Sequence, residues 1–202
     1  MEGPTASLLT RLYSRDTSTV SGKWREILYY DGRCESSALI FGDVSRRSKP
    51  VPVRVHSNCF AAHVLMSVEC DCREQMLLAQ SHIVNAGLGV VIVLPQDGRD
   101  FGHKARMLAL DLAVQRGVTQ SEVYQLLAGR TDARNYHTAA LILDDLAVQS
   151  VDLLTNNNDK VNQLVNLGID IQAVSPVKID DMATRPELRL SYEDKLSQGQ
   201  DV

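Results

Sequence analysis

Hydrophobic and polar positions follow two different patterns along this chain, and the change between them falls near residue 74. Before it, short apolar or alternating runs are separated by Gly, Asp, Ser and Pro, and they predict strands at 24–30, 38–41 and 51–55. Asp31-Gly32, between the first two runs, is typical of a hairpin turn. After residue 74, apolar residues recur at three- and four-residue steps as far as Gly87, which predicts a helix.

Strands and helices are predicted to alternate in the remainder of the chain. Apolar runs typical of buried parallel strands predict strands at 88–94, 151–154 and 169–174. Helical periodicity predicts helices at 103–115, 120–128, 137–146 and 160–167. Together these patterns predict a mixed α/β (α+β) fold, in which a β-rich N-terminal part is followed by alternating strands and helices.

A single domain is expected at 24–180, with less ordered segments on either side. Residues 1–23 are polar and turn-rich, so we expect them to lie loosely over the domain. Residues 181–202 are charged and Gln-rich, which predicts a solvated C-terminal tail. The 202 residues are enough for one domain with a core of its own.

Composition and charge exclude some classes of function. The net charge of −4 leaves no broad basic field, so we do not expect a nucleic-acid binder. No segment resembles a signal peptide and no run of about twenty apolar residues occurs, so no membrane association is expected. Four cysteines, three of them clustered, favour a metal set in the cytoplasm over a disulfide framework.

The clustered cysteines are Cys59, Cys70 and Cys72, spaced C-x10-C-x-C. Two thiolates from Cys-x-Cys and a third from an earlier strand end could hold zinc and leave its fourth position for water. Such a site is catalytic, because zinc lowers the pKa of bound water. The alternative is three unrelated buried cysteines. Cys34 has no partner nearby in sequence and is interpreted as an inert thiol.

Two further motifs follow predicted strands. Asp97-Gly98-Arg99 comes after the strand at 88–94, where α/β proteins place ligands, and offers a carboxylate, a close backbone approach and a guanidinium for phosphate. Thr155 to Lys160 leads from a strand end into a helix start, which suits phosphate. The alternatives are an ordinary strand-to-helix turn and a capped helix without a ligand.

Asp132 and Arg134 form another candidate pair. Two such residues in a loop usually make a surface ion pair of little energetic value. The functional interpretation is a proton acceptor beside an arginine that contacts substrate.

Taken together, these motifs resemble those of GTP cyclohydrolase II, the enzyme that opens riboflavin synthesis. The resemblance runs from about Ala38 to Ile171 and rests on R-V-H-S-x-C, S-V-E-C-D-C-x-x-Q, Q-D-G-R, D-A-R-N-Y and L-L-T-N-N-x-x-K, in that order. It implies a zinc-dependent hydrolase that acts on C8 of guanine, opens the imidazole ring, and releases formate and pyrophosphate. It also implies a homodimer, with Mg²⁺ as a candidate ion on the substrate phosphates.

The resemblance assigns roles residue by residue. It implies that Cys59, Cys70 and Cys72 are the zinc ligands. The proton acceptor is Asp132, and Arg134 matches the proposed nucleophile toward the α-phosphate. We interpret Arg134 as a charge clamp on the transition state. A guanidinium has a pKa above about 12, so it stays protonated at neutral pH and is a poor nucleophile. The implied nucleotide contacts are Arg54, Val55, His56, Ser57, Asn58, Gln75 (the reader of the guanine edge), Asp97, Gly98, Arg99, Thr155 and Lys160.

Several positions depart from the family pattern. Asn58, Glu69 and Asp97 stand where the family has Glu, Arg and Glu. Leu108 falls on the family's catalytic tyrosine and can neither donate nor accept a proton. Family variants with Met at that position resemble enzymes that stop at the formylamino-pyrimidine and keep the formyl group.

We therefore predict a divergent paralogue that opens the ring of GTP or a modified GTP. One alternative is a standard riboflavin-pathway enzyme that releases formate and pyrophosphate, and another is an inactive nucleotide-binding or regulatory protein. His63 is expected to be a solvent-facing loop histidine, with contact to metal or substrate as the alternative. His103 is a candidate replacement acid or base near Leu108, or a surface histidine.

Overall fold

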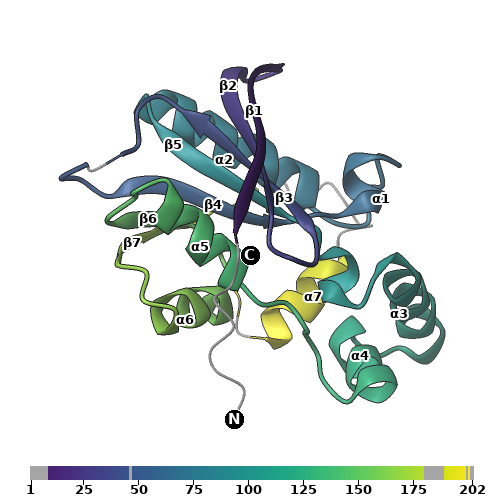
Figure 1. Cartoon of the computed structure of the whole chain (residues 1–202). Helices are drawn as coiled ribbons and strands as arrows, with labels where there is room; N and C mark the ends of the chain where they lie inside the picture. The colour runs from purple at the N-terminus through teal and green to yellow at the C-terminus, as the bar shows by residue number, and fades with distance from the viewer. Residues whose placement is uncertain (1–8, 46, 180–188, 199, 201–202) are drawn as a thin grey trace, which may run out of the picture.

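The computed structural model of the chain describes residues 9–45, 47–179, 189–198 and 200. Within these residues, seven strands form one mixed sheet in the order β1-β2-β3-β5-β4-β6-β7, with helices on both faces (Figure 1). The predicted mixed α/β class is therefore confirmed. The strands are β1 (Thr10–Thr19), β2 (Gly22–Tyr30), β3 (Glu35–Phe41), β4 (Val51–Ser57), β5 (Gly89–Leu94), β6 (Val151–Leu154) and β7 (Ile171–Ser175).

The sheet is antiparallel on one side and parallel on the other. Strands β1, β2, β3 and β5 pair antiparallel in that order. Strands β5, β4, β6 and β7 pair parallel. The carboxyl ends of these four parallel strands therefore meet at one edge of the sheet, which is where α/β folds place ligands.

Helices follow the predicted alternation. They are α1 (Phe60–His63), α2 (Cys72–Ala86), the 3₁₀ turn η1 (Asp97–Asp100), α3 (His103–Arg116), α4 (Gln120–Ala128), α5 (His137–Asp145), α6 (Asn158–Asn166) and α7 (Arg189–Ser197). Among the described residues, no helix is both long enough and apolar enough to cross a membrane.

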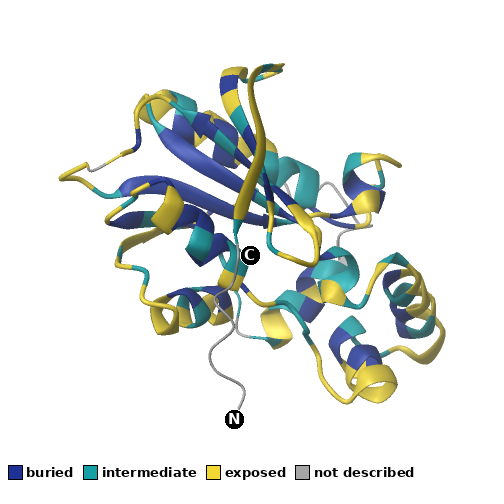
Figure 2. Ribbon diagram, viewed as in Figure 1, coloured by how far each residue is buried: buried dark blue, intermediate teal, exposed yellow. Residues whose placement is uncertain are grey.

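Strand β5 shows why its sequence is apolar without interruption. Val90 and Ile92 face a core that includes Leu143 of α5, whereas Val91 faces a second core with Ile83 of α2. Successive side chains of a strand point to opposite faces, and both faces are covered here, so every position is buried except Val93, which is partly buried (Figure 2). Gly89 starts this strand in a space where a Cβ atom would lie 2.7 Å from the carbonyl oxygen of Pro52.

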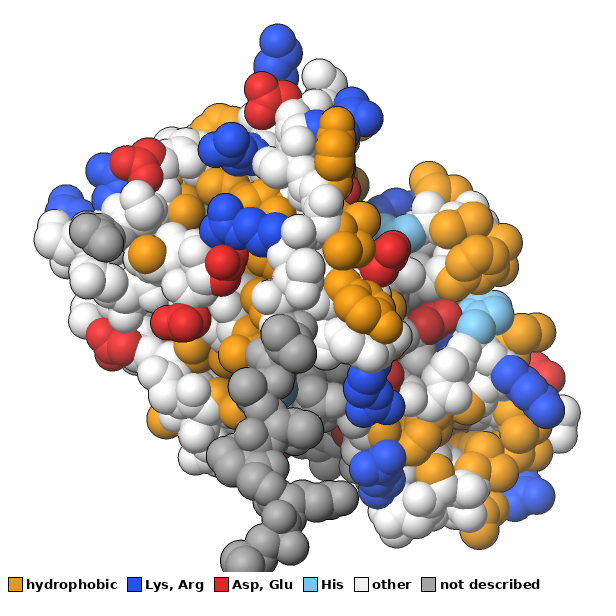
Figure 3. All heavy atoms as spheres, in the orientation of Figure 1, with side chains coloured by type: hydrophobic (Ala, Val, Ile, Leu, Met, Phe, Trp, Pro, Cys, Tyr) orange, Lys and Arg blue, Asp and Glu red, His pale blue; other side chains and the backbone are white. Residues whose placement is uncertain are grey.

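Helices α3 and α4 lie beside the sheet and pack on one another around a small core of their own (Figure 1). Thr119 begins α4 with a capping box, in which it accepts from the backbone of Glu122 and Glu122 accepts from its backbone. Exposed apolar side chains gather over α1 and over these two helices (Figure 3).

The expectation of a loosely ordered N-terminal segment is wrong for residues 10–23. Strand β1 pairs with β2 over its whole length, from Thr10 opposite Tyr30 to Thr19 opposite Gly22. Strand pairing uses backbone groups, and the side chains of β1 are mostly exposed, so no apolar alternation marks the strand. Residues 1–8 of that expectation lie outside the described residues.

The expectation of a solvated C-terminal tail is wrong for residues 189–197, which form α7. Two of its side chains are buried, Tyr192 at 3% and Asp194 at 2% exposure. The helix packs partly through polar contacts, such as the ion pairs of Asp194 and Lys195. Its sequence is therefore polar and cannot be told from that of a solvated tail. Residues 181–188 lie outside the described residues.

Candidate active site

A cavity of about 180 Å³ lies at the carboxyl edge of the parallel strands. Its walls come from the ends of β4, β5 and β6, the start of α2, and parts of α3, α4 and α7. Every predicted nucleotide-binding residue except Val55 lines it. Arg134 and the three clustered cysteines line it as well. The structure thus brings together residues that are far apart in the sequence, such as Arg54 and Lys160.

The three cysteines converge as their spacing predicted. The sulfur atoms of Cys59, Cys70 and Cys72 all lie within 4.8 Å of one another. The Sγ atoms of Cys59 and Cys70 are 3.8 Å apart, close to the separation of about 3.8 Å that two thiolates have on a tetrahedral zinc ion. This distance is too long for a disulfide bond, and all four cysteines are free.

The backbone explains the convergence. Cys59 lies two residues after the end of β4 and is the N-cap residue of α1, while Cys72 is the first residue of α2. The start of α2 carries partial positive charge, which favours a thiolate there. Hydrogen bonds with Cys59 and Cys72 lower the pKa of Cys70 to about 2. The contact with Cys70 raises the pKa of Cys59, and contacts with both other thiols raise the pKa of Cys72. Three thiolates together therefore need a cation.

Arg106 is a residue of this cluster that the motifs did not single out. It lies on α3, lines the cavity and is 9% exposed. Burial lowers the pKa of its guanidinium, but the nearby cysteines outweigh burial and the net pKa is raised. Arg106 therefore places a fixed positive charge beside the sulfur atoms.

At the base of the cavity, buried Arg54 holds Gln75. Arg54 donates from Nη2 to Gln75 Oε1 at 2.7 Å and from Nη1 to the Leu154 carbonyl oxygen at 2.9 Å. Gln75 in turn donates from Nε2 to Asp71 Oδ2 at 2.8 Å. Burial lowers the pKa of Arg54. The amide of Gln75 is thus held between Arg54, which can only donate, and Asp71, which can only accept.

His56 and His63 form a pair next to the cysteines. Their Nε2 atoms are 2.9 Å apart, so one ring donates to the other. His56 is 2% exposed, and burial lowers its pKa well below the usual value, as burial also lowers the pKa of His63. The expectation of a solvent-facing loop histidine is therefore wrong for His63, because it ends helix α1, is only partly exposed and has its ring hydrogen-bonded to His56.

Turn η1 holds the Asp97-Gly98-Arg99 motif in strained backbone. Gly98 has φ 59° and Arg99 has φ 58°, in the left-handed region that few residues other than glycine adopt. The Arg99 guanidinium donates to Ser121 Oγ at 2.8 Å and to the Thr131 carbonyl oxygen at 3.0 Å, and it pairs with Asp194. Arg99 therefore faces the cavity while also tying η1 to its surroundings.

Asp97 is paired on the other side of the same turn. Its Oδ2 atom lies 3.1 Å from His103 Nδ1, and the His103 ring packs edge-on against Phe60 at 5.0 Å between ring centres. His103 is thus near a predicted nucleotide contact. Leu108, which follows one turn later on α3, is 41% exposed and is not among the residues that line the cavity.

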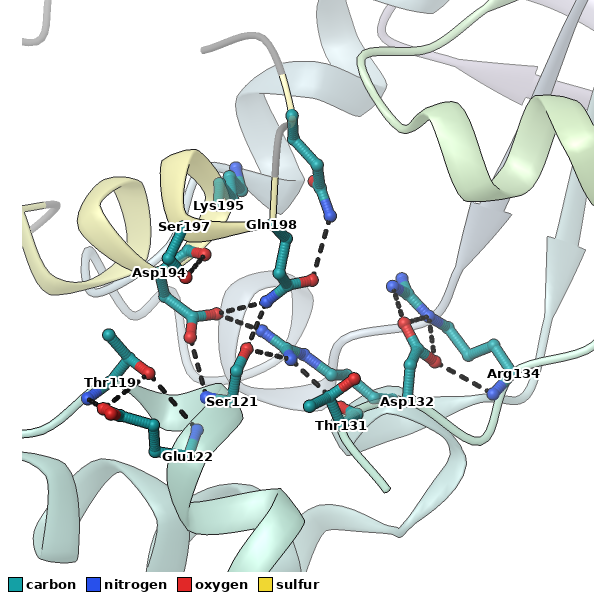
Figure 4. A network of polar contacts seen from close by, with 12 residues as sticks. Thr119, Ser121, Glu122, Thr131, Asp132, Arg134, Asp194, Lys195, Ser197 and Gln198 are labelled. Atoms are coloured by element: carbon teal, nitrogen blue, oxygen red, sulfur yellow. Dashed lines mark hydrogen bonds and ion pairs between the residues drawn. The ribbon is translucent and has the colours of Figure 1, made fainter.

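Asp132 and Arg134 form a close ion pair rather than an open surface pair. Arg134 Nε lies 3.0 Å from both carboxylate oxygens of Asp132, and the two side chains point toward one another (Figure 4). Burial alone would raise the pKa of Asp132, but its hydrogen bonds with Arg134 lower it overall. Burial would lower the pKa of Arg134, but Tyr136 and Asp132 raise it overall. Asp132 itself does not line the cavity.

Lys160 is the most enclosed cation of the site. It is 4% exposed, donates from Nζ to the Val55 carbonyl oxygen at 2.6 Å, and lies 5.3 Å from the centre of the Tyr136 ring. Burial and the charges of Arg54 and Arg134 lower its pKa well below the usual value. Val55 thus contributes its carbonyl group to the site, although its side chain is in the core.

Helix α7 supplies the lining residues that sequence reasoning missed most completely. Ser191, Asp194 and Lys195 of this helix line the cavity, as does Gln200 beyond its end. No motif marked them, because a polar helix carries the same signal as a solvated tail.

Comparisons with known proteins place similar sequences in one family. A family model described as "GTP cyclohydrolase II" matches residues 10–176. "Riboflavin biosynthesis protein RibBA" of Bacillus velezensis is 39% identical over 150 residues, which are 74% of this chain and 37% of that protein. The protein of the same name from Chlamydia muridarum is 44% identical over 140 residues, 68% of this chain and 32% of that protein.

"GTP cyclohydrolase-2" of Haemophilus influenzae is 32% identical over 153 residues, which are 76% of this chain and 70% of that protein. The chain therefore spans well under half the length of the RibBA relatives but most of the length of this one. A solved structure of RibBX, a two-domain 3,4-dihydroxy-2-butanone 4-phosphate synthase from A. baumannii, has a TM-score of 0.46 and 18% identity, covering 85% of this chain and 41% of that one.

Proposed function

Because the chain belongs to the GTP cyclohydrolase II family, we propose that it is a zinc-dependent hydrolase that opens the imidazole ring of a guanine nucleotide and releases pyrophosphate. The observation that carries this proposal is the convergence of three sulfur atoms on a cavity that also holds Arg54, Arg134 and Lys160. The sulfur cluster suits a soft metal ion, and the cations suit an anionic substrate.

The residues present fit zinc. Cys59, Cys70 and Cys72 offer three thiolates at tetrahedral spacing, beside the cavity rather than enclosed in the core. Zinc bound there would supply Lewis-acid activation of water for attack on the ring carbon. The positive charge of Arg106 beside the sulfur atoms offsets the negative charge of three thiolates.

The two ends of the cavity suit the two ends of a nucleotide. Gln75 is held with one Nε2 hydrogen and one Oε1 lone pair free to read a guanine edge. Arg134 offers positive charge to the phosphates, and Lys160 offers the N–H groups of its Nζ atom. Arg134 acts as a charge clamp rather than as a nucleophile, because its pairing with Asp132 raises its pKa and keeps it protonated.

Asp132 is proposed as the proton acceptor of the reaction. Its pKa is lowered, so it is ionised at neutral pH. It is also engaged by Arg134, so a substrate phosphate that draws Arg134 away would release the carboxylate for proton transfer.

Leu108 favours a second version of this function, in which the product keeps its formyl group. No proton donor or acceptor stands at this position of α3, and the side chain is 41% exposed and does not line the cavity. His103, hydrogen-bonded to Asp97 at 3.1 Å, is the group of α3 that could replace the missing tyrosine. We also propose a homodimer, as the family resemblance implies, with Mg²⁺ on the substrate phosphates and a cytoplasmic location.

The deciding experiment incubates zinc-loaded protein with GTP and, in parallel, with 8-oxo-GTP, and reads the products by mass spectrometry together with a formate assay. Loss of formate and pyrophosphate would identify standard turnover despite Leu108. A product that retains the formyl group would support the truncated reaction. Conversion of 8-oxo-GTP alone would mean that the pocket is specific for a modified nucleotide. Conversion of neither nucleotide would contradict the proposed enzyme and favour a nucleotide-binding protein.

A further inference from the structure

Helix α7 forms part of the wall of the cavity, which its residues Ser191, Asp194 and Lys195 line. It comes from the end of the chain, beyond the part that the family model matches. Two consecutive residues of this helix, Asp194 and Lys195, make ion pairs with residues that reach the cavity from other elements.

Asp194 fastens the helix to the wall formed by η1 and α4. Its carboxylate accepts from the Ser121 backbone N–H at 2.7 Å and pairs with the guanidinium of Arg99. Figure 4 shows Asp194 facing Ser121, with Gln198 completing the network at 3.1 Å. Asp194 is 2% exposed, and its carboxylate has hydrogen-bond and ion-pair partners on η1 and α4. These contacts fix the position of α7 against the two elements.

Lys195 leaves the helix in a different direction and reaches the start of α2. Its Nζ atom lies 2.5 Å from Asp71 Oδ1. The other oxygen of Asp71 accepts from Gln75 Nε2 at 2.8 Å, and Gln75 Oε1 accepts from Arg54 at 2.7 Å. One continuous chain of charge-assisted hydrogen bonds thus runs from α7 to the base of the cavity.

This chain determines which way the amide of Gln75 points. Asp71 can only accept and Arg54 can only donate, so the NH₂ group faces Asp71 and the oxygen faces Arg54. Asp71 is 3% exposed, and Lys195 is the cation that pairs with its carboxylate. Without Lys195, this buried carboxylate would lose that partner. The carboxylate would then move toward solvent, and the orientation of the amide would be held at one end only.

We propose that Lys195 is a positioning residue for base recognition, which acts through Asp71 to hold Gln75 in the orientation that accepts guanine. This inference rests on the proposed function, because the role of Gln75 as the base reader belongs to it. The C-terminal helix is then part of the substrate site and contributes to specificity. A helix that only covers the cavity would contribute to affinity for every nucleotide alike.

The test compares GTP with inosine triphosphate, which lacks the 2-amino group of guanine, in the zinc-loaded full chain. Lys195→Met removes the ammonium group, Lys195→Arg restores a cation, and Leu196→Ala is the matched control because Leu196 is 57% exposed on the same helix. We expect Lys195→Met to raise KM for GTP roughly tenfold with a smaller change in kcat, as loss of one charge-assisted hydrogen bond predicts. Its preference for GTP over inosine triphosphate in kcat/KM should fall by a similar factor.

Lys195→Arg should recover most of the preference, and Leu196→Ala should match the parent protein. Zinc content and thermal unfolding are measured for each variant, since Asp71 lies between Cys70 and Cys72. Lys195→Gln serves as a second neutral variant if Lys195→Met does not fold. An unchanged preference in a folded, zinc-loaded neutral variant would overturn the proposal, as would an equal loss for both nucleotides.

Failure of the proposed function is recognised separately. If the parent protein converts neither nucleotide, the same variants are compared by calorimetric titration with GTP and inosine triphosphate. A loss of preference in binding would then support the positioning role of Lys195 without catalysis. Equal affinity of the parent protein for both nucleotides would overturn it.

Discussion

Lys160 gives the protein a pH-dependent stability that can be measured independently of activity. Its ammonium group is 4% exposed, and burial together with Arg54 and Arg134 lowers its pKa well below the usual 10.5. Between the lowered pKa and about 10.5, the unfolded chain binds a proton that the folded chain does not, so the free energy of unfolding rises with pH. The full slope for one group is about 1.4 kcal/mol per pH unit.

The perturbation is Lys160→Met, which keeps the length of the side chain and removes the titrating group. We expect the free energy of unfolding of the parent protein, minus that of Lys160→Met, to rise with pH below about 10.5, by at most about 1.4 kcal/mol per pH unit. Taking the difference cancels the titration of the cysteines, which both proteins share. Nucleotide affinity should fall in the same variant, because Met has no N–H group to donate to the phosphates.

Urea unfolding at several pH values, with zinc present at one concentration throughout, measures this difference. Lys104→Met is the matched control, since it makes the same substitution at a lysine that is exposed on α3. A difference that does not change with pH for Lys160→Met would refute the reasoning, because it would mean that Lys160 titrates alike in the folded and unfolded chains.

Three further predictions test other parts of the structure. Cys72→Ser should lose bound zinc and ring opening while its circular dichroism stays close to that of the parent, and turnover that persists without metal would contradict the zinc site. Arg134→Ala should slow pyrophosphate release more than it weakens nucleotide binding, as measured by single-turnover kinetics and titration; equal losses would count against a charge clamp. Thr119→Ala removes the capping box of α4 and should lower the free energy of unfolding by about 1 kcal/mol in urea unfolding, with unchanged kcat, whereas an unaltered midpoint would mean that the cap is not needed.

Much of the sheet could be predicted from the sequence because burial on two faces leaves a local signature. The run at 88–94 is apolar throughout, and β5 is covered by α5 on one side and α2 on the other. Glycines also marked helix ends correctly, as at Gly87, whose φ of 77° ends α2 in the left-handed region. Such features depend on residues that are close in sequence, so the sequence alone reveals them.

The site could be predicted because its residues sit in short motifs at strand ends and helix starts. The spacing of Cys59, Cys70 and Cys72 indicated a common point, and the three sulfur atoms meet there within 4.8 Å. The roles of these residues remain predictions. Arg106 escaped notice because a single arginine on a helix has no spacing pattern of its own, and only the packing of α3 brings it to the sulfur atoms.

The ends of the chain were decided by tertiary structure. Strand β1 forms through backbone pairing with β2, which leaves no trace in the side chains, and α7 forms from residues whose charges would equally suit solvent. A charged residue is stable in the interior only when a partner of opposite charge lies within reach. The amino-acid sequence determined that Asp194 and Lys195 carry charge; only the fold placed Arg99 and Asp71 beside them, and so converted a polar tail into a wall of the cavity.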